Sequence, residues 1–138
     1  MKNWTALAVI LLLAALSGCA QTNASGSDEI KELKVSLNGP IKVDLNKSYH
    51  YTAHVTYGDQ KVEDAKVEFE VVSSDGTDEM KKATAAGNGD YKLDYTFRSD
   101  SIYSIQSHVS ARDQHNMPKI EIMAGKGGKQ AMNMEMKH

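Results

Sequence analysis

The stretch "AKVEFEVV", residues 65–72, decides the fold class. Apolar residues alternate in it with charged ones, Val67, Phe69 and Val71 against Lys66, Glu68 and Glu70. Successive side chains of a β-strand point to opposite faces, so this pattern predicts a strand with one buried and one solvated face. A single wet face is typical of antiparallel sheets and excludes a doubly covered parallel α/β sheet.

The same period of two recurs on both sides of this stretch. Turn signals separate the segments, the strongest being Asn88-Gly89, which is typical of a two-residue hairpin. We therefore predict an all-β, immunoglobulin-like antiparallel β-sandwich over residues 30–124, with a small closed barrel as the alternative. Its seven strands are expected at residues 30–37, 49–57, 65–72, 80–85, 91–97, 101–113 and 117–123.

The N-terminus has the layout of an export signal. Lys2 precedes an uncharged stretch whose apolar core, residues 6–16, is shorter than the roughly 18 residues that a membrane-spanning helix needs. The sequence Leu16-Ser-Gly-Cys19 resembles the bacterial lipobox, in which the cysteine becomes the lipidated first residue of the mature protein. We expect residues 1–18 to be a lipoprotein signal peptide and residues 19–29 a lipidated tether, the alternative being a plain secretory signal with an incidental cysteine.

The N-terminal segment indicates where the protein is located, and its cysteine bears on how the domain is held together. Lipid on Cys19 would attach the chain to the outer side of the bacterial cell membrane, and stable attachment requires more than one acyl chain. Cys19 is the only cysteine, so no intrachain disulfide can form and the core alone must hold the domain. The net charge is −2 and both signs are interspersed, which argues against nucleic acid as a partner.

Catalytic patterns are missing from the sequence. It contains no nucleophile elbow, no paired-carboxylate motif and no phosphate-cradling glycine loop. We therefore expect a protein that is not an enzyme.

Two longer motifs carry a family resemblance. "GDQKVEDAKVEFEV" (residues 58–71), Met80 and "GNGDYKLDYTFRSDSIYSIQSHVSARDQHNMPKIEI" (residues 87–122) resemble the YtkA-like, or FixH-like, family of exported domains. The resemblance covers residues 44–122, and "HVSARDQHNMP" (residues 108–118) is its most specific part. It implies an immunoglobulin-like sandwich outside the cytoplasmic membrane and an association with copper handling and oxidase maturation. FixH proteins proper carry a membrane helix before the domain, whereas this chain has the lipobox-like segment.

The last motif contains candidate ligands for a soft metal ion. Imidazole and thioether groups suit Cu(I), and His115 and Met117 are the surest members of such a set. If residues 113–116 form the hairpin loop, Arg112 faces Met117, and His108 lies more than about 10 Å away along the strand. We expect His108 and Met80 to join the site only if the fold brings them there. The alternative is a solvent-facing His108 with Met117 at the edge of the core.

The C-terminal residues 125–138 supply a second candidate site. They show no apolar periodicity and predict a mobile, Met-rich tail. In an extended chain, residues two apart share one side about 6.6 Å from each other, so the tail could collect a soft ion, or its methionines could bind nothing. The candidate ligands of the tail are Met132, Met134, Met136 and His138.

The pair His50 and His54 does not predict a metal site. The surrounding segment "YHYTAHVTY" is a predicted strand, on which residues four apart lie about 13 Å from each other. We expect both to be exposed strand histidines.

Together these features predict a membrane-anchored extracytoplasmic lipoprotein that binds copper as a carrier or an oxidase-maturation factor. Its partners would be the membrane, through Cys19, and an envelope or oxidase-assembly protein. The alternative is a metal-free interaction module that scaffolds a cell-envelope complex.

Overall fold

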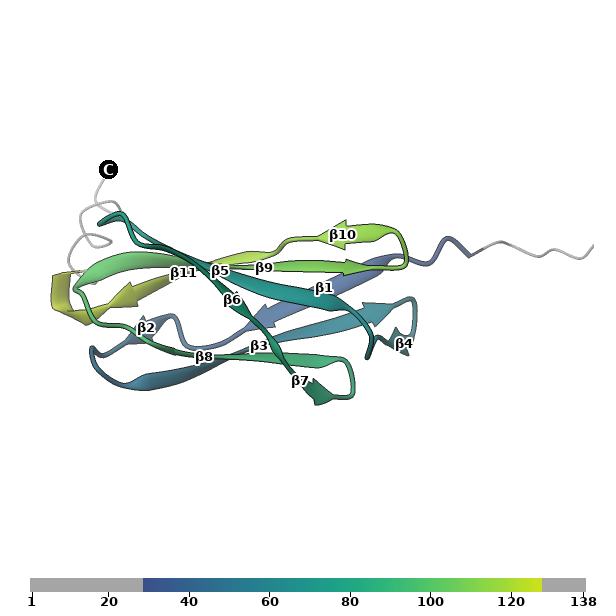
Figure 1. The fold of residues 1–138 in the computed structure, drawn as a ribbon, viewed down its shortest axis with the longest axis horizontal. Coiled ribbons are helices and arrows are strands. Elements are labelled where there is room, and N and C mark those ends of the chain that lie inside the picture. The colour runs from purple at the N-terminus through teal and green to yellow at the C-terminus, as the bar shows by residue number, and fades with distance from the viewer. Residues whose placement is uncertain (1–28, 128–138) are drawn as a thin grey trace, which may run out of the picture.

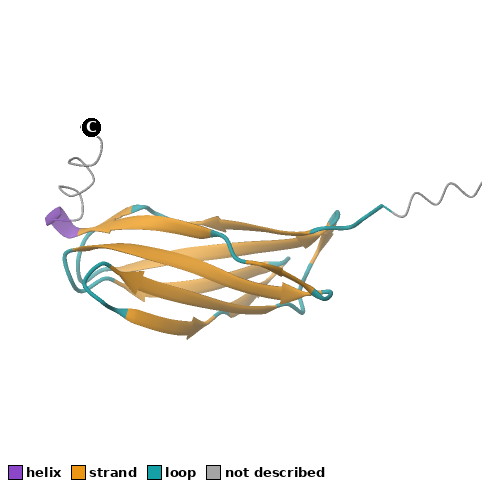
Figure 2. Ribbon diagram, turned by 90° about the horizontal axis from the view of Figure 1, so that it is seen from above, coloured by secondary structure: helices purple, strands orange, loops and turns teal. Residues whose placement is uncertain are grey.

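The computed structural model describes residues 29–127, in which two β-sheets stack face to face (Figures 1 and 2). Sheet A has the strand order β1 (Leu33–Asn38), β3 (Ser48–Tyr57), β8 (Asp90–Thr96) and β7 (Thr84–Gly87), with β4 (Gln60–Lys61) beside β3. Sheet B has the order β2 (Lys42–Val43), β11 (Lys119–Ala124), β9 (Ser101–Ala111), β5 (Lys66–Ser73) and β6 (Asp78–Lys82), with β10 (Gln114–Asn116) beside β9.

This topology is the immunoglobulin-like sandwich that the sequence predicts. Strands β1, β3, β8 and β7, in this order, pack against strands β11, β9 and β5. This is the four-plus-three arrangement of a constant-type immunoglobulin domain, and β6 extends the smaller sheet. Tyr103, near the start of β9, hydrogen bonds through its hydroxyl to the carbonyl oxygen of Ser99 at 3.3 Å. That contact is the tyrosine corner of immunoglobulin-like folds.

The buried faces of the strands form one core between the sheets. Val67, Phe69 and Val71 are at most 6% exposed, which confirms the alternation that decides the fold class. An edge-to-face aromatic contact joins the sheets, since the ring centroid of Phe97 lies 4.9 Å from that of Tyr103. Three more tyrosines surround Phe97, namely Tyr49, Tyr51 and Tyr95.

The expected strand over residues 80–85 is wrong in one respect. The chain forms two strands there, β6 in sheet B and β7 in sheet A, with Ala83 between them. The short strands β2, β4 and β10 were not expected, because two or three residues cannot show a period. The β2–β11 pair is parallel, so sheet B is mixed rather than purely antiparallel.

The turns explain how β9 and β10 come to pair. Asn88 and Gly89 have φ of 56° and 78°, which confirms the expected hairpin between β7 and β8. Arg112 and Asp113 have φ of 52° and 59°, so they form a two-residue turn of the same kind. The expected loop over residues 113–116 is therefore wrong. The turn escaped prediction because left-handed backbone is usually supplied by glycine, asparagine or aspartate, and Arg112 is none of these.

The two ends of the described chain lie at opposite ends of the sandwich (Figure 1). Residues 125–127, where the sequence predicts the start of a mobile tail, form a helical turn, visible in Figure 2. The amide of Gly127 donates to Asp100 Oδ1 at 2.7 Å and holds this turn against the domain. Within residues 29–127, no helix has the length and apolar character needed to cross a bilayer.

Candidate metal site on the outer face of sheet B

The strand register places Met117 directly opposite His108. Asn116 pairs with Val109, and beyond Pro118 the register continues unchanged with Lys119 opposite Gln106. The amide of Ser107 donates to the carbonyl oxygen of Pro118 at 3.0 Å. The next pair, His108 and Met117, is then a non-hydrogen-bonded pair, whose Cα atoms lie about 4.5 Å apart.

This placement corrects the expected position of His108. The expected loop over residues 113–116 would place His108 more than about 10 Å from Met117 along the strand. Because the chain reverses already at Arg112 and Asp113, β10 runs back beside β9 and meets His108 from across the ladder. Pro118 has no amide hydrogen for the ladder, and this missing bond separates β10 from β11 without shifting the register.

His115 belongs to the same surface. It pairs with Ser110 and precedes Met117 by two residues, so both side chains leave the sheet on one side. The spacing along the strand is about 6.6 Å, and the diagonal from His115 to His108 is about 7–8 Å. These separations allow one ion to contact all three side chains.

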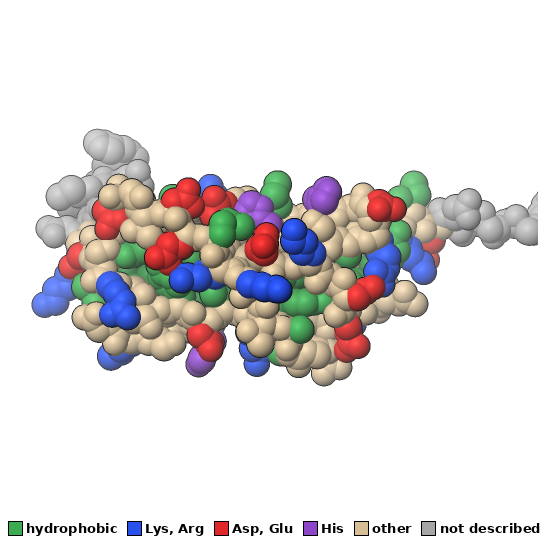
Figure 3. Space-filling model, in the orientation of Figure 1, with side chains coloured by type: hydrophobic (Ala, Val, Ile, Leu, Met, Phe, Trp, Pro, Cys, Tyr) green, Lys and Arg blue, Asp and Glu red, His purple; other side chains and the backbone are tan. Residues whose placement is uncertain are grey.

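The surface in question faces solvent. The neighbours of His108 on β9, Ser107 and Val109, are at most 1% exposed and point into the core, so His108 points outward. Met117 is 53% exposed, which excludes the alternative in which it fills the edge of the core. Figure 3 shows histidine, hydrophobic and acidic side chains together along the upper side of the molecule, the side formed by sheet B.

Met80 lies on the same face but farther away. It pairs with Glu70 in the middle of β6, and it is 53% exposed. β5 separates β6 from β9, so two strand spacings, about 9.6 Å, lie between Met80 and the row of His108. The structure therefore gathers His108, His115 and Met117 and leaves Met80 at the margin.

Hydrogen bonds orient both imidazole rings. His108 Nε2 lies 2.8 Å from Glu70 Oε2, and His115 Nδ1 lies 2.6 Å from Ser110 Oγ. These contacts leave His108 Nδ1 and His115 Nε2 without a partner among the described residues. Sequence reasoning did not find Glu70 or Ser110, because the first contact depends on the β5–β9 register and the second on the β9–β10 register.

The donor set determines which ions fit. Two imidazole nitrogens and one thioether sulfur are the ligands that Cu(I) prefers. No group of three or more His, Cys, Asp or Glu side chains is placed to hold a metal ion within residues 29–127.

A protein-family model matches the domain that carries these side chains. The model of the YtkA-like family matches residues 27–108, more than half of the chain. The chain belongs to the YtkA-like family. The match ends at His108, so His115 and Met117 lie beyond the matched residues, although they fall within the resemblance seen in the sequence. No curated protein matches the chain.

Several solved structures are similar to this YtkA-like domain. A PKD domain of an M14-like peptidase from Thermoplasmatales archaeon SCGC AB-540-F20 has a TM-score of 0.48 and 14% identity, covering 67% of this chain and 93% of that one. The CARDB domain of a Pyrococcus furiosus protein, in complex with di-metal ions, has a TM-score of 0.46 and 18% identity, covering 70% and 96%. A PKD domain of human KIAA0319 has a TM-score of 0.47 and 18% identity, covering 73% and 88%.

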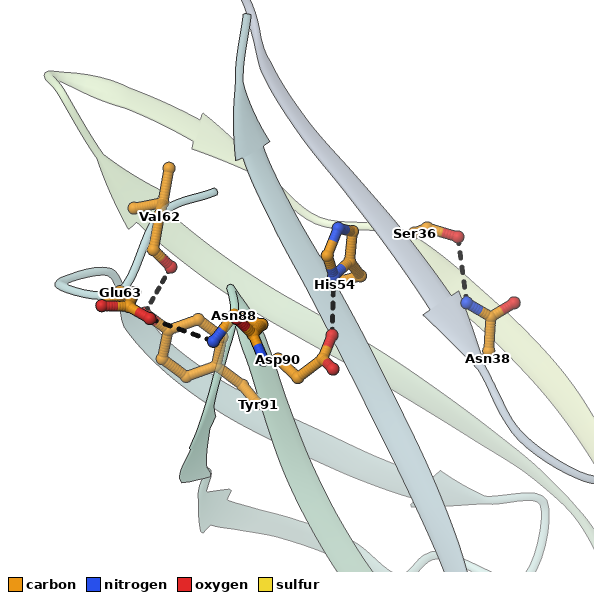
Figure 4. A network of polar contacts seen from close by, with 8 residues as sticks. All are labelled: Ser36, Asn38, His54, Val62, Glu63, Asn88, Asp90 and Tyr91. Carbon is orange, nitrogen blue, oxygen red and sulfur yellow. Dashed lines mark hydrogen bonds and ion pairs between the residues drawn. The ribbon is translucent and has the colours of Figure 1, made fainter. Parts of the chain in front are cut away.

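The YtkA-like domain carries its other two described histidines on the outer face of sheet A. His50 pairs with Asp94 and His54 with Asp90, each through Nδ1, and the His54–Asp90 distance is 2.6 Å (Figure 4). The two histidines lie on one strand, about 13 Å apart, so they cannot share an ion. The remaining candidates, Cys19, Met132, Met134, Met136 and His138, lie outside the described residues.

Proposed function

We propose that this YtkA-like domain binds Cu(I) on the outer face of sheet B through His108, His115 and Met117. The observation that carries the proposal is the register that sets Met117 opposite His108 with His115 on the same side. Cross-strand neighbours of a non-hydrogen-bonded pair approach more closely than any other pair in a sheet. The two side chains of this pair and one diagonal neighbour provide two imidazole nitrogens and one soft thioether sulfur for one ion.

The exposure of the site to solvent favours a role in carrying copper over a role in which the metal ion stabilises the fold. The core closes without a metal ion, since its buried residues form one continuous cluster between the sheets. An ion on a flat face such as this remains accessible to a second set of ligands from a partner protein, and ligand exchange is what delivery requires.

We also propose that the domain works at the outer surface of the bacterial cell membrane, attached through lipid on Cys19. Gln114 accepts a hydrogen bond from the amide of Leu33 at 2.8 Å, so the chain enters the domain beside the β9–β10 hairpin (Figure 1). The end of sheet B that carries His115 would then face the anchor. A membrane-bound oxidase-assembly protein is the proposed receiver.

Competitive titration with Cu(I) against a chelator tests the proposal. A chain that begins at Thr22 retains every core residue, because the buried cluster extends from Leu33 to Ala124. We expect the double variant His115→Ala/Met117→Ala to weaken Cu(I) binding tenfold or more, which corresponds to about 1.4 kcal/mol. His50→Ala/His54→Ala is the matched control, with two histidines removed from the opposite sheet and no expected change.

Two results would overturn this assignment. Affinity no tighter than micromolar in the unmutated chain would end the copper proposal. A chain that stops at Gly127 keeps the contact with Asp100 and lacks Met132, Met134, Met136 and His138. If only this truncation loses Cu(I), the C-terminal segment is the site and the sheet face is not.

The second candidate function is a metal-free interaction module. It is favoured by the open edge of β6, which pairs only with β5 among the described strands. Such an edge can accept an added strand from a partner. Glu79 and Lys81, which pair with core residues of β5, form an ion pair at 3.4 Å along this edge, and charges placed there oppose strand addition. For this reason the copper site is the better supported function.

A further inference from the structure

We infer that Glu70 is a positioning residue that holds the imidazole of His108 with Nδ1 as the metal donor. The inference rests on the proposed copper site and goes beyond it, because it assigns the donor atom and the residue that selects it. The contact between His108 Nε2 and Glu70 Oε2 at 2.8 Å carries the argument.

The contact is specific to one of two carboxylates on β5. Glu68 is the residue directly opposite His108 in the register, and Glu70 is its diagonal neighbour. Of these two carboxylates, only that of Glu70 hydrogen bonds with the ring in the part of the chain that the structure describes. The side chains of His108 and Glu70 are 32% and 27% exposed, so solvent competes less for this bond than at a fully exposed pair.

The hydrogen bond selects the tautomer of a neutral ring. A carboxylate only accepts, so His108 must carry its hydrogen on Nε2 to donate to Glu70. The lone pair then lies on Nδ1, which has no partner among the described residues. A metal-bound histidine commonly donates its other N–H to a carboxylate in this way.

His108 differs in this respect from the other histidines that the structure describes. His50, His54 and His115 all make their contacts through Nδ1. His115 therefore presents Nε2, whereas His108 presents Nδ1. The proposed site accordingly combines one donor of each kind with the sulfur of Met117.

Glu70 also separates Met80 from the ion. Met80 is the direct partner of Glu70 on β6, and His108 reaches Glu70 from the other side. The strand that carries Glu70, β5, lies between Met80 on β6 and His108 on β9. Met80→Ala should then leave the Cu(I) affinity within about twofold of the unmutated value, a change of about 0.4 kcal/mol.

Nitrogen-15 NMR of the imidazole rings tests the inference in the metal-free protein. We expect His108 to show hydrogen on Nε2 and a bare Nδ1. Glu70→Leu should give a mixture of tautomers, whereas Glu70→Gln should keep the pattern, because the amide oxygen still accepts. Glu68→Leu is the matched control on the same strand and face, and it should change nothing. Urea unfolding of each variant verifies that the fold is retained.

Metal binding completes the test. With Ag(I) as an NMR-active substitute for Cu(I), we expect coupling to His108 Nδ1 and to His115 Nε2. Glu70→Leu should weaken Cu(I) binding about 10- to 100-fold, as loss of an outer-shell partner does, and Glu70→Gln should restore most of the affinity. Coupling to His108 Nε2, or a Glu70→Leu variant with unchanged tautomer and affinity, would overturn the inference and leave the copper site intact. A protein that shows the tautomer but binds no Cu(I) would overturn the proposed function and the donor role with it.

Discussion

Asn116 donates a hydrogen bond from its side-chain amide to the carbonyl oxygen of Leu33 at 3.0 Å, joining β10 to the edge of the opposite sheet. Gln114 makes two further bonds, from Nε2 to the carbonyl oxygen of Lys31 and from the amide of Leu33 to Oε1. Residues 114 and 116 thus face β1, while His115 and Met117 face the solvent. One short strand carries both the contact to the N-terminal segment and two of the proposed ligands.

Removing this contact should loosen the strand that carries the ligands. We expect Gln114→Ala/Asn116→Ala to lower the free energy of unfolding by about 2–3 kcal/mol, since three hydrogen bonds are lost at about 1 kcal/mol each. Urea unfolding followed by circular dichroism measures the loss. Ser36→Ala, which removes only the exposed bond to Asn38, is the control and should change stability by less than about 0.5 kcal/mol. Equal effects in the two variants would show that β10 is held by its backbone ladder alone.

The strands with one buried and one solvent-exposed face could be predicted from the sequence, because the apolar residues that recur with a period of two are also the buried ones. In β5 and β8 the alternation coincides with the buried set that includes Phe69, Tyr91 and Leu93. The split at Ala83 was not predictable, because β6 and β7 are largely exposed and show no alternation of buried and exposed residues. The chain changes there from pairing with the preceding strand β5 to pairing with the following strand β8.

The site was predicted as a set of residue types and not as a geometry. His115, Met117 and His108 stay predicted ligands, and the distances between them depend on where one turn lies. Two non-glycine residues, Arg112 and Asp113, take left-handed backbone there, and local sequence preference does not indicate this. Arg112 Nη1 lies 3.0 Å from the carboxylate of Asp64, a tertiary contact that helps to fix the turn.

Asp113 offers a direct test of that turn. It has φ of 59°, which glycine adopts without the steric cost that Asp has, so Asp113→Gly should stabilise the domain by about 0.5–1 kcal/mol. Asp59→Gly is the matched control in the β3–β4 turn, where only Gly58 has positive φ, and it should destabilise slightly through unfolded-state entropy. Urea unfolding compares the two. Stabilisation by Asp59→Gly as well would disprove a specific role of the backbone at residue 113.

Asp75 should make the stability fall at low pH. Hydrogen bonds from the hydroxyls of Ser73 and Ser99, and then from Thr77, lower the pKa of the Asp75 carboxyl from 3.8 to about 2. A lowered folded-state pKa gives stability that is present above the unfolded value and is lost as the pH falls through the folded value. The contribution of Asp75 should therefore disappear between pH 4 and about 2. In urea unfolding, Asp75→Asn should be less stable than the unmutated chain at pH 5, and the difference should narrow toward pH 2. A difference that is constant with pH would mean that the carboxylate charge has no part in it.

Gly125 tests how the chain leaves the domain. A Cβ at this residue would lie 2.2 Å from Asp100 Oδ1, and φ is +71°. Gly87 has a similar φ of +82° but nothing within 4 Å of its Cβ position, so Gly87→Ala measures the backbone cost alone, about 1–2 kcal/mol. Gly125→Ala should cost more, about 2–3 kcal/mol, because the carboxylate must move and give up the amide of Gly127. When Asp100→Ala is introduced as well, the carboxylate no longer obstructs a Cβ at residue 125, and the two glycine substitutions should lower the free energy of unfolding equally. The effects of substitutions at two residues in contact are not additive. If Gly125→Ala and Gly87→Ala cost the same with Asp100 present, the carboxylate does not restrict the glycine and only φ matters there.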